Sequence, residues 1–141
     1  MTPRETVTYD ELSPLQLEQY HALLEESDSE PMFYGKPLSR NTPRQIVLDD
    51  DDNVVGAFEY TRTLWEGTYY WRANRPYVLK AHRGKGLLVP ALRLWFLNRR
   101  PALAWIDDEN LASIRLFFSL GFSREYAYTM HGKLGHFYVL H

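Results

Sequence analysis

The sequence contains no cysteine, and this absence excludes disulfide bonds, a cysteine nucleophile and thiolate metal ligands in a chain of 141 residues. A strong charge of either sign is also missing: 16 Lys and Arg stand against 18 Asp and Glu, so no global basic field favours nucleic-acid binding. No apolar run reaches the ~20 residues of a membrane span, and no signal pattern opens the chain. We therefore expect a cytoplasmic protein that does not enter a membrane.

Apolar residues are abundant, at 45%, and aromatic residues reach 15%, so the composition is that of a globular protein with a sizeable core. The length fits one domain spanning residues 1–141. The five histidines show no metal-ligand spacing. The run Asp49–Asp52 lacks the alternating ligands of a calcium loop and predicts a solvated hairpin turn instead. We expect no metal site.

Hydrophobic periodicity and turn residues predict a mixed α/β (α+β) sheet with helices on both faces. The expected order is β, α, loop, β, β, β, α, β, α, β, β. The expected strands are Glu5–Tyr9, Gln45–Leu48, Val54–Thr63, Thr68–Leu79 (with a bulge near Pro76), Ala102–Ile106, Ser123–Met130 and His136–Leu140. The expected helices run from Pro14 to about Glu26, from Gly86 to before Pro101, and from Glu109 to Leu120.

The most informative stretch is 78–88, where an extended apolar run ends in a small basic turn and a helical pattern begins. Backbone amides gathered at such a turn, together with the positive end of a helix, suit a bound anion such as a phosphate. Gly84 and Gly86 allow the main chain to approach the anion closely, and Arg83 and Lys85 add positive charge.

Two motifs resemble those of the GNAT superfamily of N-acetyltransferases. The run 83–88 (Arg-Gly-Lys-Gly-Leu-Leu) stands beside the family pattern Arg/Gln-x-x-Gly-x-Gly/Ala. The run 110–114 (Asn-Leu-Ala-Ser-Ile), with Leu120, Gly121 and Phe122, resembles the family pattern Asn-x-x-Ala followed by Leu-Gly-Phe. The resemblance covers roughly Val54 to the C-terminus and implies a GNAT-like fold and the use of acetyl-CoA as acyl donor.

The resemblance also implies a set of cofactor-binding residues. The backbone around Pro76, Tyr77 and Val78 would pair with the pantetheine arm at a bulge, beside a slot between two splayed strands. The amides from Gly84 to Leu88 would hold the pyrophosphate, and Asn110 would reach the cofactor from the second motif. The full expected set is Tyr77, Val78, Arg83, Gly84, Lys85, Gly86, Leu87, Leu88 and Asn110.

The motifs depart from the family pattern at two positions that matter for activity. Leu88 stands where the family usually has Gly or Ala, and Phe117 stands where a tyrosine often protonates the CoA thiolate. The run 113–117 and Gly121-Phe122 also resemble a phage-encoded subgroup, which would place the protein in a bacterial host cell. An alternative therefore stays open, namely a non-enzymatic protein on the same fold that is a phage structural component or a partner-binding module.

Several residues are candidates for proton transfer to and from the reacting groups. Glu59 is the acidic residue inside its strand, and burial of a carboxyl group suits it to act as a general base; the alternative is a solvent-facing strand residue. Asp107 and Asp108 either face the acceptor or cap the following helix. Tyr126, with Tyr128 and Tyr138, is a candidate acid, and the alternative is a packed aromatic residue.

The expected acceptor is a primary amine on a small molecule or peptide, and a modified nucleotide is a further option. The nucleotide would fit an aromatic and basic cluster made of Trp65, Tyr69, Tyr70 and Trp71 with Arg62, Arg72 and Arg75. The alternative for that cluster is a twisted hairpin with paired aromatics. The irregular segment Ser27–Thr42 is either a lid over the acceptor or a packed loop. The long aromatic strand and the final hairpin can pair across a homodimer.

Overall fold

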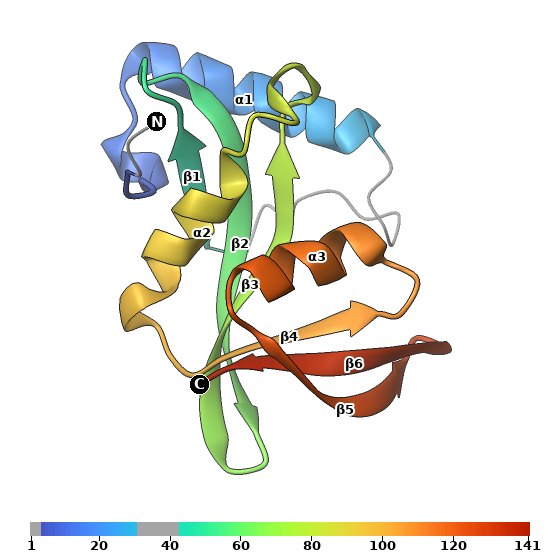
Figure 1. The fold of residues 1–141 in the computed structure, drawn as a ribbon. Coiled ribbons are helices and arrows are strands. Elements are labelled where there is room, and N and C mark those ends of the chain that lie inside the picture. The colour runs from blue at the N-terminus through green and yellow to red at the C-terminus, as the bar shows by residue number, and fades with distance from the viewer. Residues whose placement is uncertain (1–3, 31–42) are drawn as a thin grey trace. The chain divides into compact units, whose positions relative to one another are not determined.

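The structure is a computed structural model that describes residues 4–30 and 43–141 (Figure 1). The three α-helices in these ranges are α1 (Pro14–Ser29), α2 (Leu88–Trp95) and α3 (Leu111–Ser119). The strands are β1 (Arg44–Leu48), β2 (Val54–Trp65), β3 (Thr68–Val78), β4 (Ala102–Asp107), β5 (Ser123–Met130) and β6 (Lys133–Leu140). Short 3₁₀ turns lie at Tyr9–Glu11, Lys80–His82 and Phe96–Asn98.

The strands follow the hydrogen-bonded order β1-β2-β3-β4-β6-β5 in a mixed sheet. β1 and β2 are antiparallel, as are β4 and β6 and the hairpin β5–β6. β3 and β4 run parallel and pair at Trp71 and Ala102. The mixed sheet with three α-helices among the described residues confirms the predicted fold class.

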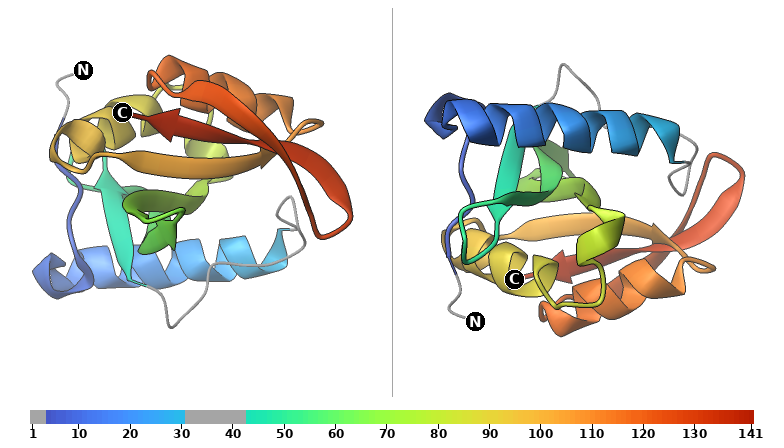
Figure 2. Two further views of the ribbon diagram at one scale, coloured as in Figure 1. Left: turned by 90° about the horizontal axis from the view of Figure 1, so that it is seen from below. Right: turned by 90° about the horizontal axis from the view of Figure 1, so that it is seen from above.

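The chain divides into two compact units, and the first consists of Met1–Thr61 and Ala73–Trp95. Its helix α1 begins where the sequence predicts: Ser13 accepts a hydrogen bond from the Gln16 amide, and Pro14 is the first helical residue. α1 lies along β1 and the adjoining part of β2 (Figure 2). The apolar contact joins Tyr20, Leu23 and Leu24 of α1 to strand residues that include Ile46, Leu48, Val54, Ala57 and Tyr77.

The other helix of this unit, α2, packs on the opposite face of β2. Phe58 and Tyr60 of β2 contact the Trp95 ring of α2, with ring centroids 5.3 and 5.6 Å away. Because side chains alternate along a strand, Glu59 between them points toward the α1 face. Leu92 of α2 is fully buried. The two helices of the first unit therefore cover opposite faces of its strands.

The second unit consists of Arg62–Arg72 and Phe96–His141. Its buried cluster is formed by Leu103, Phe137 and Val139, and the side chains of Trp65, Tyr70, Trp105 and Met130 pack against it. On the other face of β6, Tyr138 meets the ring of Phe118 from α3 at 5.5 Å. His131 and Gly132 form the turn of the β5–β6 hairpin with φ angles of 54° and 74°, and this confirms the predicted final hairpin.

Three expectations about the first third of the chain need comment. The predicted strand Glu5–Tyr9 is wrong: only Val7 pairs with Ile46, in an isolated bridge, because a capping box at Thr8 turns the chain into the 3₁₀ turn at once. The predicted helix continues to Ser29, three residues beyond the expected end. Most of the predicted acceptor loop Ser27–Thr42 lies outside the described residues.

Candidate active site

The basic turn of the first unit has the backbone that a phosphate-binding turn needs. Gly84 and Gly86 have φ angles of 79° and 65°, in the left-handed region that favours glycine. No atom lies within 4 Å of the point where a Cβ would stand on either residue. The space beside the turn is therefore open to a ligand, and α2 begins two residues later at Leu88.

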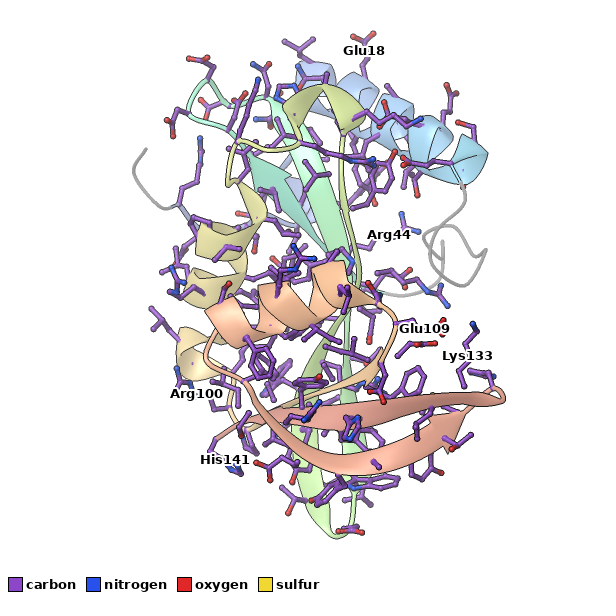
Figure 3. All side chains as sticks on the ribbon, turned by 45° about the vertical axis from the view of Figure 1, so that its right-hand side comes forward. Glu18, Arg44, Arg100, Glu109, Lys133 and His141 are labelled. Atoms are coloured by element: carbon purple, nitrogen blue, oxygen red, sulfur yellow. The ribbon has the colours of Figure 1, made fainter. Side chains whose placement is uncertain are left out.

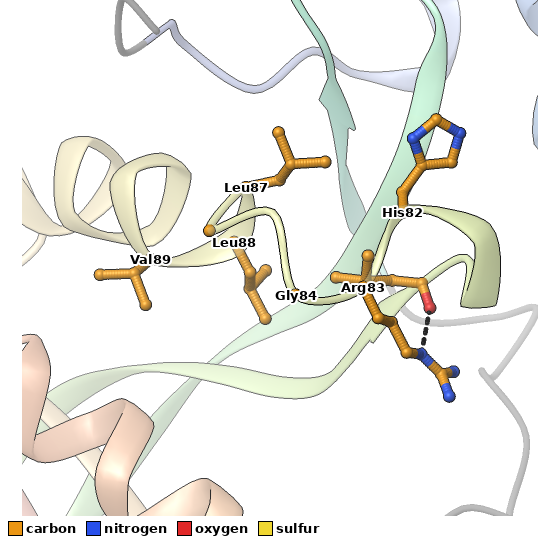
Figure 4. Close-up of a pocket in the computed structure, with 8 residues that line it drawn as sticks. His82, Arg83, Gly84, Leu87, Leu88 and Val89 are labelled. Carbon is orange, nitrogen blue, oxygen red and sulfur yellow. Dashed lines mark hydrogen bonds between the residues drawn. The ribbon is translucent and has the colours of Figure 1, made fainter.

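A pocket opens between the end of β3 and the start of α2 (Figure 4). Apolar side chains and glycine main chain dominate its lining, which consists of Val78, His82, Arg83, Gly84, Gly86, Leu87, Leu88 and Val89. In the described parts of the chain, the amides of Gly86 and Leu87 donate no hydrogen bond to another group. Two N–H donors beside the positive end of a helix suit an anion. Most of the residues predicted to bind the cofactor thus meet at one pocket.

Arg83 uses its side chain to attach the turn to α1. Its Nη1 and Nη2 donate to the two carboxylate oxygens of Glu30 at 2.8 and 2.7 Å. Its Nε donates to the carbonyl oxygen of Val78 at 2.9 Å (Figure 4). The hydrogen bonds from Arg83 lower the pKa of Glu30 to about 2, and Glu30 in turn raises the pKa of Arg83. The bidentate geometry fixes the orientation of the turn.

Tyr77 adds a second connection between this turn and α1. Its hydroxyl lies 2.7 Å from Oε2 of Glu26 and 2.6 Å from Oε2 of Glu30, and its single hydrogen is shared between these two acceptors. Glu26 also accepts a hydrogen bond from the amide of Lys80. Burial, with these carboxylates as a further cause, raises the pKa of Tyr77. The side chain of Tyr77 is therefore part of the core, and any contact with a cofactor falls to its main chain.

Glu59 is buried, with 3% of its surface exposed. Its Oε1 lies 3.4 Å from Nη1 of Arg75, and Arg44 stands opposite it in the β1–β2 register. Arg75 has a φ of 49°, so β3 is distorted just before Pro76, where the sequence predicts a bulge. The alternative of a solvent-facing Glu59 is therefore excluded. Its carboxylate lies on the α1 face, beside the guanidinium group of Arg75.

In the second unit, the loop after β4 carries Asn110. The side chain of Asn110 caps α3 by accepting a hydrogen bond from the amide of Ser113 at 3.2 Å. The prediction that Asp107 or Asp108 caps this helix is therefore wrong. Oδ1 of Asp107 instead accepts from the Glu109 amide within the loop. The cap uses the side-chain oxygen of Asn110 and not its amide nitrogen.

The loop also holds a contact that the sequence did not reveal. Nδ1 of His136, from β6, lies 2.6 Å from Oδ1 of Asp108. Beside it, Nζ of Lys133 lies 3.9 Å from Oδ2 of the buried Asp107. Figure 3 labels Glu109 in this loop and Lys133 at the hairpin turn. Asp108 and His136 are 28 positions apart in the sequence, and no sequence motif contains both. The contact could not be predicted because it depends on how the strands pair.

The remaining candidates of the second unit are aromatic. Tyr126 is 44% exposed, and its ring packs edge-on to Phe137; partial desolvation raises the pKa of Tyr126. Phe117, at the position of the usual tyrosine, is buried against Phe122 at 4.9 Å. Phe117 is therefore a core residue of this unit.

In the aromatic and basic cluster of the β2–β3 hairpin, one part packs against the core of the second unit and another part forms cation–π contacts. Trp65 packs against the buried cluster of the second unit, with its ring 4.8 Å from Phe137. The guanidinium of Arg62 lies over the rings of Tyr69 and Trp71, at 5.7 and 5.0 Å. The packed part matches the alternative of paired aromatics.

Within residues 4–30 and 43–141, no group of acidic and histidine residues is placed to hold a metal ion, and no helix is long and apolar enough to cross a membrane.

The comparison with solved structures shows that the chain has the fold of GNAT-family acetyltransferases. An acetyltransferase of the GNAT family from Bacillus anthracis matches with a TM-score of 0.65 and 19% identity, over 87% of this chain and 89% of that chain. The ribosomal-protein-alanine N-acetyltransferase from Brucella melitensis matches with a TM-score of 0.65 and 20% identity, over 92% of this chain and 96% of that chain.

A third match is to the NatC complex bound to Gag peptide and CoA, with a TM-score of 0.64 and 15% identity, over 97% of this chain and 98% of that chain. No family model matches the sequence, and no curated protein matches it. At these identities the comparison shows the fold, and it confirms the GNAT-like fold expected from the two motifs.

Proposed function

We propose that the protein is an acetyl-CoA-dependent N-acetyltransferase that acetylates a primary amine. The observation that carries the proposal is the glycine turn that opens onto the start of α2. Its left-handed glycines, the space beside them and the amides of Gly86 and Leu87 fit a pyrophosphate. The apolar side chains of Val78, Leu87 and Leu88 in the same pocket fit the uncharged part of a pantetheine arm.

Within this proposal, each predicted residue has a defined part. Gly84, Lys85, Gly86, Leu87 and Leu88 hold the pyrophosphate, largely through main-chain groups. Arg83 supplies its main chain to the turn, while its side chain positions the turn through Glu30.

The main chain of Tyr77 and Val78 pairs with the arm. The assignment of Asn110 to the cofactor stays a prediction. When bound, acetyl-CoA supplies a thioester, which is an activated acyl group. The assignment of Glu59 as base and Tyr126 as acid stays a prediction, as does the slot between splayed strands.

The solved structures named above are acetyltransferases, and this supports turnover over the alternative of a structural or partner-binding protein. One of them is bound to Gag peptide and another is a ribosomal-protein-alanine N-acetyltransferase, so a peptide N-terminus is a reasonable first acceptor to test. A small-molecule amine and a modified nucleotide stay open.

Titration calorimetry with acetyl-CoA and with CoA tests the proposal directly. We expect both to bind at one site, with similar affinity, because the pyrophosphate and pantetheine contacts are common to them. A protein that is folded by circular dichroism and binds neither ligand at millimolar concentration would refute the function. Binding of CoA without acetyl transfer to any amine would instead support the non-enzymatic alternative.

A further inference from the structure

Arg44, the first residue of β1 and labelled in Figure 3, holds two buried hydrogen-bond donors that the described chain does not satisfy. Its Nη1 donates to the hydroxyl oxygen of Tyr20 at 2.6 Å. Its Nε and Nη2 are buried, and no group in the described ranges accepts a hydrogen bond from either. Buried donors in proteins normally have partners, because an unpaired one has given up its bonds to water for nothing. The guanidinium group of Arg44 is therefore suited to a ligand that supplies acceptors.

The two nitrogens lie on one edge of the guanidinium group. Nη2 is the terminal nitrogen on the same side as the Nε–H group, so one N–H bond of each nitrogen points in the same direction. This planar fork matches the two oxygens of a carboxylate, which it binds through two parallel hydrogen bonds. A water molecule has a single oxygen and fits the fork less well. The geometry of the edge therefore favours a carboxylate.

The charges around Arg44 also favour an anion. Glu59 is opposite Arg44 in the β1–β2 register, and Oε1 of Glu59 lies 3.4 Å from Nη1 of Arg75. Directly opposite residues of an antiparallel pair point to the same face of the sheet, so the three charged groups form a row across β1, β2 and β3. Among the described residues, this row has two positive charges and one negative charge. A bound carboxylate balances the charge of the row.

The row has a route to solvent and a limit on the size of its ligand. The side chain of Arg75 is 37% exposed, whereas that of Glu59 is 3% exposed, so the row reaches the surface at β3. Because Nε and Nη2 of Arg44 are covered, a ligand reaches them only after a side-chain rotation, and such rotamer changes are common on binding. The group that enters must also be small. A carboxylate on a small molecule meets this condition.

The row belongs to the same unit as the glycine turn. Arg75 precedes Val78, which lines the pocket beside the turn, by three residues of β3. At the rise of an extended strand, this separation is about 10 Å. A small molecule held at Arg44 therefore lies on strands of the unit that carries the proposed cofactor site.

We propose that Arg44 binds the carboxylate of the acceptor, and that the acceptor is a small amino acid whose amine and carboxylate lie close together, as in an α-amino acid. The proposal rests on the N-acetyltransferase function above and narrows its acceptor. Glu59, the predicted base, is opposite Arg44, and the Cβ atoms of such a pair are about 5 Å apart. In an α-amino acid, one carbon carries both groups, so a carboxylate bound to Arg44 keeps the amine near Glu59. A peptide N-terminus lacks this carboxylate and should be a poorer acceptor.

The first test compares α-amino acids with their carboxamides as acceptors, using acetyl-CoA and the full-length protein. Because hydrogen bonds between charged groups are strong, we expect the preferred acid to exceed its amide in kcat/KM by about 10- to 100-fold. Arg44→Lys keeps the positive charge and removes the fork, so it should lose most of this preference through a higher KM for the acid. The KM for acetyl-CoA should change by less than about twofold, since the acceptor alone contacts Arg44.

Arg4→Lys is the matched control, because it makes the same chemical change at another arginine of the first unit. Nη1 of Arg4 lies 2.6 Å from Oδ1 of Asp52, in an ion pair at the β1–β2 turn. This variant should retain the preference for acids over amides. Tyr20→Phe removes the partner of Nη1 and leaves the Nε–Nη2 edge of Arg44 intact, so it should also retain the preference. Loss of the preference in either control would show that Arg44→Lys acts through the fold.

NMR of the arginine Nε–H groups gives a readout that requires no turnover. The probes are acetate and acetamide, which have nearly the same shape and differ in charge, and the Arg44 signal is identified by its absence in Arg44→Lys or Arg44→Met. We expect acetate to shift the Arg44 signal in a saturable way, and acetamide to leave it in place.

The outcomes separate this proposal from the function on which it rests. Equal kcat/KM for acids and amides, a preference that survives Arg44→Lys, or an Arg44 signal that acetate leaves in place would overturn the carboxylate site. If no amine in the panel is acetylated, the acetate titration alone decides. Failure to bind CoA would instead refute the proposed function, whatever acetate does to the Arg44 signal.

Discussion

Replacement of Gly86 by glutamate tests the pyrophosphate turn most sharply. With a φ of 65°, Gly86 adopts a conformation that costs an L-residue about 1–2 kcal/mol. No atom lies within 4 Å of the added Cβ, so this strain is the whole cost in stability, and alanine and glutamate should share it. The glutamate adds a negative charge beside the proposed phosphate position. At ~5 Å and an effective dielectric constant of ~20, the repulsion is ~3 kcal/mol per phosphate charge.

The expected results separate strain from charge. Gly86→Ala should lower the free energy of unfolding by about 1–2 kcal/mol and weaken CoA binding by less than about tenfold, since its methyl group enters open space. Gly86→Glu should show the same loss of stability and weaken binding by at least about 100-fold. Because exposed charges are screened by salt, the difference between the two variants should shrink at high ionic strength.

Calorimetry measures the CoA affinity, and urea denaturation measures the stability. Gly132→Glu is the control: Gly132 has a φ of 74° and an equally open Cβ position, but it lies in the β5–β6 turn. It should lose stability and retain CoA affinity. If Gly86→Glu binds CoA as tightly as the unchanged protein does, the turn does not hold the pyrophosphate.

Two further predictions concern the framework of the first unit. Arg83 lowers the pKa of Glu30 from 4.5 to about 2, so the ionised Glu30 stabilises the fold above about pH 4.5 and loses this effect as the pH falls through 2. We therefore expect Glu30→Gln to be less stable than the unchanged protein in urea denaturation at pH 7. A stability difference that persists undiminished near pH 2 would contradict the assignment. Gly56→Ala places a Cβ 2.8 Å from the carbonyl oxygen of Tyr77, so we expect a loss of about 1–3 kcal/mol in the free energy of unfolding. An unchanged midpoint of urea denaturation would show that β2 and β3 can move apart at this point without loss of stability.

The parts of the fold that the sequence predicts are those encoded locally. The start of α1 follows from Ser13 and Pro14, and the β5–β6 turn follows from Gly132 and its neighbours. The shape of the turn at residues 84–86 was predictable because Gly84 and Gly86 favour a backbone conformation that other residues rarely adopt. The strand expected at the N-terminus failed because β-propensity does not show that only Val7 finds a partner.

The polar contacts of the site depend on residues far apart in the chain, and local patterns do not contain them. Arg83 looks like a phosphate ligand in the motif, yet its side chain contacts Glu30, 53 residues away. His136 and Asp108 meet because β4 and β6 pair in one register. The cap of α3 was assigned to the wrong residue because Asp107, Asp108 and Asn110 are all good caps, and the loop geometry selects Asn110.

The division of the chain into two units has a consequence for how the protein is made. The chain passes between the units at three places, after Thr61, after Arg72 and after Trp95. The buried cluster of the second unit draws Trp65 and Tyr70 from the β2–β3 hairpin, whereas Phe137 and Val139 come from the last strand. During synthesis on the ribosome, these aromatic side chains of the hairpin therefore stay without their partners until Phe137 and Val139 have emerged. A fragment that begins at Phe96 would lack those side chains, so neither unit can be produced as one continuous piece of the gene.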